Sequence, residues 1–161
     1  MIVKKTLLYI LGLWACLSYA EENLKQNEVK AFELYSQAAK LGDAGAQFSV
    51  GDAYRMGRGV KQDDQKSVEW FQKAAKQKHA GAEFWVGRAY LKGLGIKQDD
   101  RKAVEWFKKS ANQEYPMAQF NLGLYYLNGW GGAKDTQQAR YWIQKSAEKG
   151  YGKAIDKLKT L

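Results

Sequence analysis

Cysteine, histidine and proline are nearly absent from this chain, since each of them occurs once in 161 residues. A single cysteine, Cys16, cannot form a disulfide within the chain, so the stability of the fold has to come from packing. One cysteine and one histidine, His79, are too few for a metal site built on those ligands. The chain also lacks the Gly-x-Ser-x-Gly and P-loop motifs that position a catalytic serine or a nucleotide phosphate. We therefore expect no metal, no cofactor and no enzymatic activity.

The main feature that the sequence does contain is a repeat of 36 residues. Residues 57–71 (GRGVKQDDQKSVEWF) and 93–107 (GLGIKQDDRKAVEWF) are near copies of each other. The same spacing aligns a glycine, a tyrosine and a tryptophan in three successive units. These residues are Gly51, Gly87 and Gly123, then Tyr54, Tyr90 and Tyr126, then Trp70, Trp106 and Trp142. Such a period is typical of solenoids, in which each unit packs on the next.

The first half of each unit has the pattern of an amphipathic helix. In the unit that begins at Ala44, small or apolar residues recur at steps of three and four. They are Ala46, Phe48, Val50, Gly51 and Tyr54. Glycine inside a helix costs about 1 kcal/mol relative to alanine. We therefore expect the partner helix to approach closely at Gly51 and at its equivalents.

Glycine and aspartate mark the turn that joins the two helices of a unit. Gly57, Gly93 and Gly129 are expected to end the first helices, because glycine readily adopts the left-handed cap conformation. Asp63, Asp99 and Asp135 are expected to be the N-caps of the second helices. The second helix of the first unit carries Val68, Trp70, Phe71, Ala74 and Ala75 on its apolar face, and the later units repeat this pattern.

These patterns predict an all-α fold, a right-handed α/α superhelix of about three full two-helix repeats with partial capping repeats at both ends. Full units begin at Ala44, Ala80 and Pro116, where proline is tolerated as a helix start. The N-terminal cap is an unpaired second helix with Ala31, Leu34, Tyr35, Ala38 and Ala39. The C-terminal cap is the short, lysine-rich segment after Gly152.

Residues 1–20 have the pattern of a secretory signal peptide: Lys4 and Lys5, an apolar run from Leu7 to Leu17, and small residues before Glu21. A run of this length is shorter than the ~20 residues that span a bilayer, so we expect cleavage and no membrane span in the mature chain. Residues 21–161 would then form a single solenoid domain, and we expect its export to a bacterial periplasm. Secretion beyond the periplasm is an alternative, and so is a lipid anchor on Cys16, which ends a lipobox-like Leu-Trp-Ala-Cys.

Cleavage would leave a basic mature chain without cysteine. Its 24 basic and 17 acidic residues give a net charge of about +7. This charge favours acidic partners. Lysines also recur beside the tryptophans of the second helices, but glutamates four residues before Lys73 and Lys109 would compensate part of that charge. Together with export, this argues against a nucleic-acid ligand.

The units resemble Sel-one-like repeats, which are relatives of tetratricopeptide repeats, over essentially all of the chain from about Lys30. Three motifs carry this resemblance: Leu/Val-Gly-x-x-Tyr, Gly-x-Gly-Val/Ile, and Lys-Ala/Ser-Val-Glu-Trp-Phe. The third unit departs from the pattern, with Gly132 in place of Val/Ile and Gln138 in place of lysine. The resemblance implies a scaffold that holds proteins or peptides. Some cysteine-rich exported relatives have been linked to penicillin binding or weak β-lactamase activity, but their paired cysteines are absent here.

Ser146, Lys149 and His79 are of residue types that can serve in catalysis. Ser146 and Lys149 fit the Ser-x-x-Lys motif of penicillin-recognising enzymes, yet Ser146 aligns with Ala38, Ala74 and Ser110, a position that requires a small residue. His79 is the last residue of its unit, in register with aromatic residues, and is expected to pack at the junction between units. A cell-wall or β-lactam-binding protein therefore remains the alternative function, and a secreted host-interaction factor of the same fold is another.

Binding residues are expected where the repeats differ, on the first helices, because positions constant in all units serve the fold. In tetratricopeptide relatives the first helices line the concave surface. The predicted binding residues are Asp52, Arg55, Trp85, Arg88, Lys92, Asn121 and Asn128. The cationic members would attract acidic groups, and Trp85 would supply an apolar contact. We expect a monomer that binds a protein or peptide through this face, and we expect removal of Trp85 and Arg88 to leave stability nearly unchanged.

Overall fold

The computed structural model describes the backbone of residues 2–130 and 132–161 and the side chains of residues 18–130 and 132–161. Within these ranges every regular element is a helix, which confirms the predicted all-α class. In chain order the helices are α1 (Ile2–Lys40), α2 (Ala44–Met56), α3 (Asp64–Lys76), α4 (Ala80–Lys92), α5 (Asp100–Asn112), α6 (Pro116–Asn128), α7 (Thr136–Glu148) and α8 (Gly152–Leu158). The Cys16 side chain lies outside the described residues, so its lipidation stays a prediction.

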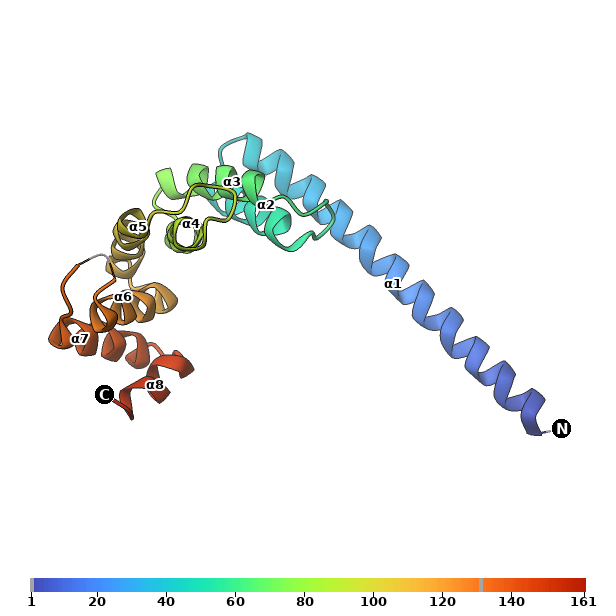
Figure 1. The fold of residues 1–161 in the computed structure, drawn as a ribbon. Coiled ribbons are helices and arrows are strands. Elements are labelled where there is room, and N and C mark those ends of the chain that lie inside the picture. The colour runs from blue at the N-terminus through green and yellow to red at the C-terminus, as the bar shows by residue number, and fades with distance from the viewer. Residues whose placement is uncertain (1, 131) are drawn as a thin grey trace.

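The helices stack in chain order as an α-solenoid. Each helix packs mainly on the one before it and the one after it. Figure 1 shows the stack curving from α1 to α8, with α1 projecting from one end as a long rod. The pairs α2 with α3, α4 with α5 and α6 with α7 are the three full units that the sequence predicts. Helix α1 caps one end of the stack, and the short α8 caps the other.

The predicted caps are confirmed in all three units. Gly57, Gly93 and Gly129 follow the first helices with φ values of 70°, 67° and 72°, in the left-handed region. The carboxylates of the three predicted N-caps each accept a hydrogen bond from the backbone N–H three residues on, at the start of the second helix. They are Asp63, Asp99 and Asp135. Each cap satisfies a backbone group that the end of a helix would otherwise leave unpaired.

The glycines inside the first helices allow the two helices of a unit to touch. A Cβ atom at Gly51 would lie 2.7 Å from the Phe71 ring, and one at Gly123 would lie 2.5 Å from Cγ1 of Ile143. At Gly87 the corresponding distance to the Phe107 ring is 3.0 Å. The cost of a helical glycine is therefore offset by close packing of the second helix, as the sequence predicts.

The core follows the second helices, but the recurring tryptophans lie at its edge. Phe71, Phe107 and Ile143 are fully buried at one repeat position. The tryptophans one residue earlier in each unit are only half-buried. Lys73 Nζ lies 3.8 Å from the Trp70 ring centroid, and Lys109 Nζ lies 4.0 Å from that of Trp106. These lysines therefore lie over the tryptophan rings of their own helices. The described residues show no ion pair of Lys73 with Glu69 or of Lys109 with Glu105, the pairs that the sequence predicted.

The two ends of the solenoid differ in how they are covered. Helix α1 continues without a break through the predicted cleavage site between Ala20 and Glu21. Glu21 and Asn23 are the repeat equivalents of Gly57 and Gly59 in the next unit. The chain therefore has no glycine at this point to end a helix with a left-handed cap. Among the described residues no first helix precedes α1 and packs on it in the way that α2 precedes and packs on α3, and Leu34 is 60% exposed. In the described part of the chain, no helix combines the length and the hydropathy needed to cross a membrane.

Candidate binding surface on the first helices

The structure brings four of the seven predicted binding residues together, from two successive units. On α2, Arg55 Nη2 lies 2.6 Å from Asp52 Oδ1. The Arg55 guanidinium lies 4.1 Å from the ring centroid of Trp85 on α4, and the Arg88 guanidinium lies 4.8 Å from the same centroid. We call Asp52, Arg55, Trp85 and Arg88 the Trp85 cluster. It joins neighbouring first helices, as expected for a surface that runs along the stack.

Trp85 is half-buried, because one side of its ring packs on the core. The ring stacks on Phe71 with centroids 6.0 Å apart and an interplanar angle of 13°. It also meets Phe84 edge to face, with centroids 5.5 Å apart. Trp85 is therefore partly a core residue, which the sequence did not indicate.

The charges of the Trp85 cluster are only partly neutralised. Asp52 pairs with Arg55, and its second carboxylate oxygen lies 3.7 Å from Arg58 Nη2. Arg88 lies over the Trp85 ring, where a cation gains about 0.5 to 1 kcal/mol at an exposed site. Lys92 is exposed at the last turn of α4, close in sequence to Arg88. Arg88 and Lys92 can therefore offer N–H donors to a carboxylate from outside.

The two asparagines of α6 are occupied locally. Asn121 Nδ2 donates to Met117 O at 2.7 Å, and Asn128 Nδ2 donates to Leu124 O at 3.0 Å. Both bonds return to the same helix, one turn earlier. The structure therefore does not bring Asn121 and Asn128 into the Trp85 cluster.

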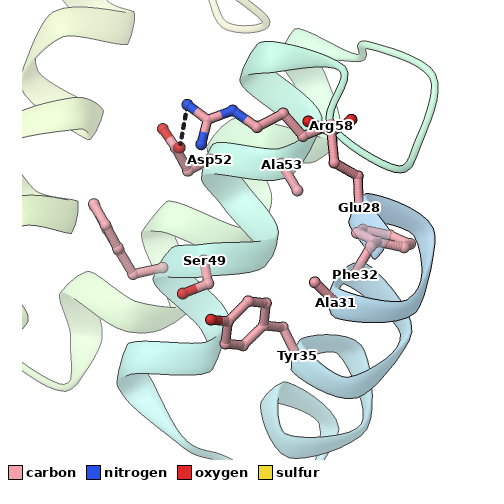
Figure 2. A pocket seen from close by; sticks show the side chains of 9 residues that line it. Glu28, Ala31, Phe32, Tyr35, Ser49, Asp52, Ala53 and Arg58 are labelled. Carbon is pink, nitrogen blue, oxygen red and sulfur yellow. Dashed lines mark ion pairs between the residues drawn. The ribbon is translucent and has the colours of Figure 1, made fainter. Parts of the chain in front are cut away.

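A cavity between α1 and α2 was missed by the sequence reasoning. Its volume is about 370 Å³. It is lined by Glu28, Ala31, Phe32, Tyr35, Phe48, Ser49, Asp52, Ala53 and Arg58. Figure 2 shows the side chains of Tyr35 and Ser49 on its two sides, with the Asp52–Arg58 ion pair at one end. The sequence signal that could have revealed this cavity is the unpaired second helix in α1. Because no first helix precedes it in the described structure, the surface between α1 and α2 is left uncovered.

The Ser-x-x-Lys motif has a structural explanation. Ser146 is fully buried, and its Oγ donates to Pro116 O at 2.7 Å. Ser110, 36 residues earlier, makes the same bond to Ala80 O at 2.7 Å. Lys149 is directed to Glu114, with Nζ 2.7 Å from Oε2. Ser146 therefore ties α7 to the start of α6, and its lysine partner in the motif lies in a surface ion pair.

His79 is the N-cap of α4 and packs at the junction between units. Its Nδ1 accepts a hydrogen bond from the backbone N–H of Ala82 at 3.1 Å. Its ring stacks on Phe48 with centroids 4.6 Å apart. Burial lowers the pKa of His79, which suits the neutral form that this cap requires. In the described residues no three or more histidine, cysteine or carboxylate side chains are grouped so that they could hold a metal ion.

Glu83 is the one buried carboxylate on the first helices among the described side chains. Burial raises its pKa, while the hydrogen bond that Gln113 Nε2 donates to Oε2 at 2.7 Å opposes that shift. In the unit before, Gln77 Nε2 donates in the same way to Gln47 Oε1 at 2.9 Å. Because each bond joins the first helix of a unit to the C-cap residue of the second helix of the same unit, Glu83 serves the packing of the two helices within its unit.

Comparison with known proteins identifies the repeat. The Sel1 repeat model matches residues 8–43, 44–79, 80–115 and 116–151. The last three ranges have the same boundaries as the full units found in the sequence. The first range joins the copy of the second helix in α1 to residues 8–20. These residues have the pattern of a signal peptide. A search of curated proteins gave no significant match.

Solved structures with the same repeat resemble this chain. A Sel1 repeat protein from Oxalobacter formigenes is 34% identical, with a TM-score of 0.77 over 81% of this chain and 54% of that one. A protective antigen of uropathogenic Escherichia coli with an SLR fold is 33% identical, with a TM-score of 0.76 over 81% of this chain and 28% of that one. This chain thus spans about half and about a quarter of the two proteins.

Helicobacter pylori cysteine rich protein B shares the fold at 22% identity, with a TM-score of 0.65 over 83% of this chain and 96% of that one.

Proposed function

This chain belongs to the Sel1 repeat family, whose members generally are scaffolds for protein interactions. We propose that it is an exported, non-enzymatic scaffold. It acts as a monomer and binds an acidic protein or peptide through the first helices. The Trp85 cluster is the observation that carries this proposal, because it places cations and an aromatic ring from two units on one surface. Arg and Trp are the residue types that most often dominate binding energy at interfaces.

The charge of the cluster favours a carboxylate as the ligand group. Asp52 is already paired with Arg55 and Arg58, whereas the described residues show no ion pair for Arg88 or Lys92. A guanidinium can bind a carboxylate through two parallel hydrogen bonds, a geometry that an ammonium group does not offer. We therefore assign Arg88 the main contact and Lys92 a long-range attraction.

Export rests on the N-terminal pattern, and the relative from uropathogenic Escherichia coli supports it. That protein is named as a protective antigen. Mass analysis of the present chain recovered from cells is expected to show Glu21 as the first residue. A lipidated Cys16 at the N-terminus would instead place the protein on a membrane surface, and an intact Met1 would rule out cleavage.

Affinity capture from the envelope fraction tests the binding surface. We expect Arg88→Glu with Lys92→Glu to lose partners that the wild-type chain captures, because both changes reverse the charge that faces an acidic ligand. Lys153→Glu with Lys159→Glu is the matched control, since it makes the same change in net charge on the exposed lysines at the far end of the solenoid. Equal capture by all three proteins would contradict the assignment of this surface.

A further inference from the structure

The cavity between α1 and α2 has a counterpart in the next unit. A smaller cavity of about 30 Å³ lies between α3 and α4. Eight of its nine lining residues follow those of the first cavity by the repeat length of 36, and Arg55 is the exception. Ala31, Tyr35, Ser49 and Asp52 in the first cavity correspond to Ser67, Phe71, Trp85 and Arg88 in the second. The two cavities are therefore the same place in successive repeats.

A helix covers the second cavity and not the first. Arg55, on α2, lines the second cavity, where its guanidinium lies over the Trp85 ring. Gly51, one turn earlier on α2, lets the helix backbone approach Phe71, and its carbonyl accepts a hydrogen bond from Ser67 Oγ at 2.8 Å. Before α1 the equivalent helix is missing, because the preceding residues extend α1 as a rod (Figure 1).

We propose that the first cavity is a seat for an α-helix of a partner protein, which takes the place that α2 has in the next unit. This proposal rests on the proposed function, because export removes residues 8–20, the segment that the repeat register assigns to the seat. Without that segment the mature chain begins with only the second half of a repeat. The partner's helix supplies the other half.

The template within the chain defines the chemistry of the partner's helix. A glycine or alanine faces Tyr35, as Gly51 faces Phe71. Four positions later the helix carries a long side chain, since the three full units have Arg55, Leu91 and Leu127 at that position. Glu28 and Asp52 line the seat beside Arg58 (Figure 2), so a lysine or arginine at this position meets a carboxylate.

The exposed surface of α1 agrees with a missing partner. Terminal repeats of solenoids normally present a polar outer face. Here Tyr35 is 48% exposed, although its equivalents Phe71, Phe107 and Ile143 are buried. The first helix of each full unit covers that position, so the exposure of Tyr35 follows from the absence of such a helix.

A synthetic peptide with the sequence of residues 44–57 is a suitable probe, because α2 covers the equivalent seat. Its binding to the chain purified from the envelope fraction can be measured by fluorescence anisotropy. The control peptide carries Gly51→Leu, which improves helix propensity and blocks the close approach. We expect the control to bind at least about 10-fold more weakly, since overpacking at a tight contact costs 1 to 3 kcal/mol.

Variants of the protein test the same contact from the other side. Ala31→Arg places a long side chain where the helix backbone should lie, and we expect at least about 10-fold weaker peptide binding. Ala31→Ser restores the donor that Ser67 supplies in the next unit, and we expect binding a few-fold tighter. Gln37→Arg, also exposed on α1 but outside the seat, is the matched control and should bind like the wild type.

Three results would overturn the proposal. If a chain that begins at Glu21 binds both peptides equally, or binds them independently of Ala31→Arg, the seat is wrong and the surface around Arg88 is unaffected. Dimerisation that Ala31→Arg abolishes would identify a second copy, and not a partner, as the occupant. A chain recovered with residues 8–20 intact would contradict export, and the chain's own residues 8–20, not a partner, would then be the candidate occupant of the seat.

Discussion

Arg55 and Trp85 join two successive repeats, with the guanidinium carbon of Arg55 4.1 Å from the centroid of the Trp85 ring. The two residues are 30 positions apart and belong to the first helices α2 and α4. Trp85 in turn stacks on Phe71, so the contact links the surface cations to the core. The proposed binding surface and the core that holds the repeats together therefore share one side chain.

This shared role changes the expected effect of replacing Trp85. Trp85→Ala should lower the free energy of unfolding by about 2 kcal/mol, less than the 3 to 5 kcal/mol of a fully buried tryptophan. The sequence alone suggested almost no loss. Arg88 is half-buried over the Trp85 ring, so Arg88→Ala removes a cation–π contact and should cost about 0.5 to 1 kcal/mol. Urea titration of the two single variants separates these outcomes, and a negligible loss for Trp85→Ala would show that its ring is free to act as a binding anchor alone.

Adjacent aromatic residues in α5 should differ in their contribution to stability. Phe107 is fully buried between α4 and α6, so Phe107→Ala should destabilise the chain by about 3 to 5 kcal/mol. Trp106 is half-buried under Lys109, and Trp106→Ala should cost roughly half as much. Denaturant unfolding of both variants provides the comparison. Equal losses would mean that Trp106 is as deeply packed as Phe107.

The glycine inside α6 should tolerate no side chain. Gly123→Ala places a Cβ 2.5 Å from Ile143 Cγ1 and 3.1 Å from the Ala139 carbonyl oxygen. We expect a loss of about 1 to 3 kcal/mol in unfolding free energy, although alanine favours the helix. Gly152→Ala is the control, because nothing lies within 4 Å of its Cβ position. A Gly123→Ala protein as stable as the control would contradict the close approach of α6 and α7.

His79 should make stability fall on mild acidification. Because burial lowers its pKa below the ordinary 6.5, the unfolded chain binds a proton more readily than the folded chain does. The contribution of His79 is fully present above pH 6.5 and is lost as the pH falls from there through the lowered pKa. His79→Asn keeps a side-chain acceptor at the N-cap but cannot titrate in this range.

The measurement is the difference in unfolding free energy between wild type and His79→Asn from pH 8 to pH 5. That difference should be constant at the upper end of the range and shift in favour of the variant at the lower end. A difference that does not change with pH would mean that His79 has the same pKa in the folded and unfolded chains.

The sequence by itself determined the helices, their ends and the apolar face of each unit. Gly57 and Asp63 fix a helix end and a helix start through conformations and hydrogen bonds that involve only neighbours along the chain. Gly51 and Phe71 recur in register, so their contact within a unit could also be predicted. Periodicity reports such local and repeated interactions, because every unit solves the same packing problem.

Contacts between different units were decided only by the tertiary structure. The variable residues Arg55 and Trp85 carry no period, so nothing in their spacing shows that one lies over the other. The uncovered cavity beside Tyr35 likewise depends on a helix that fails to fold back. Local propensity fixes which residues form a helix, whereas the distance and rotation between stacked helices depend on all the side chains between them. For that reason the repeat and its core follow from the sequence, and the shape of its surfaces does not.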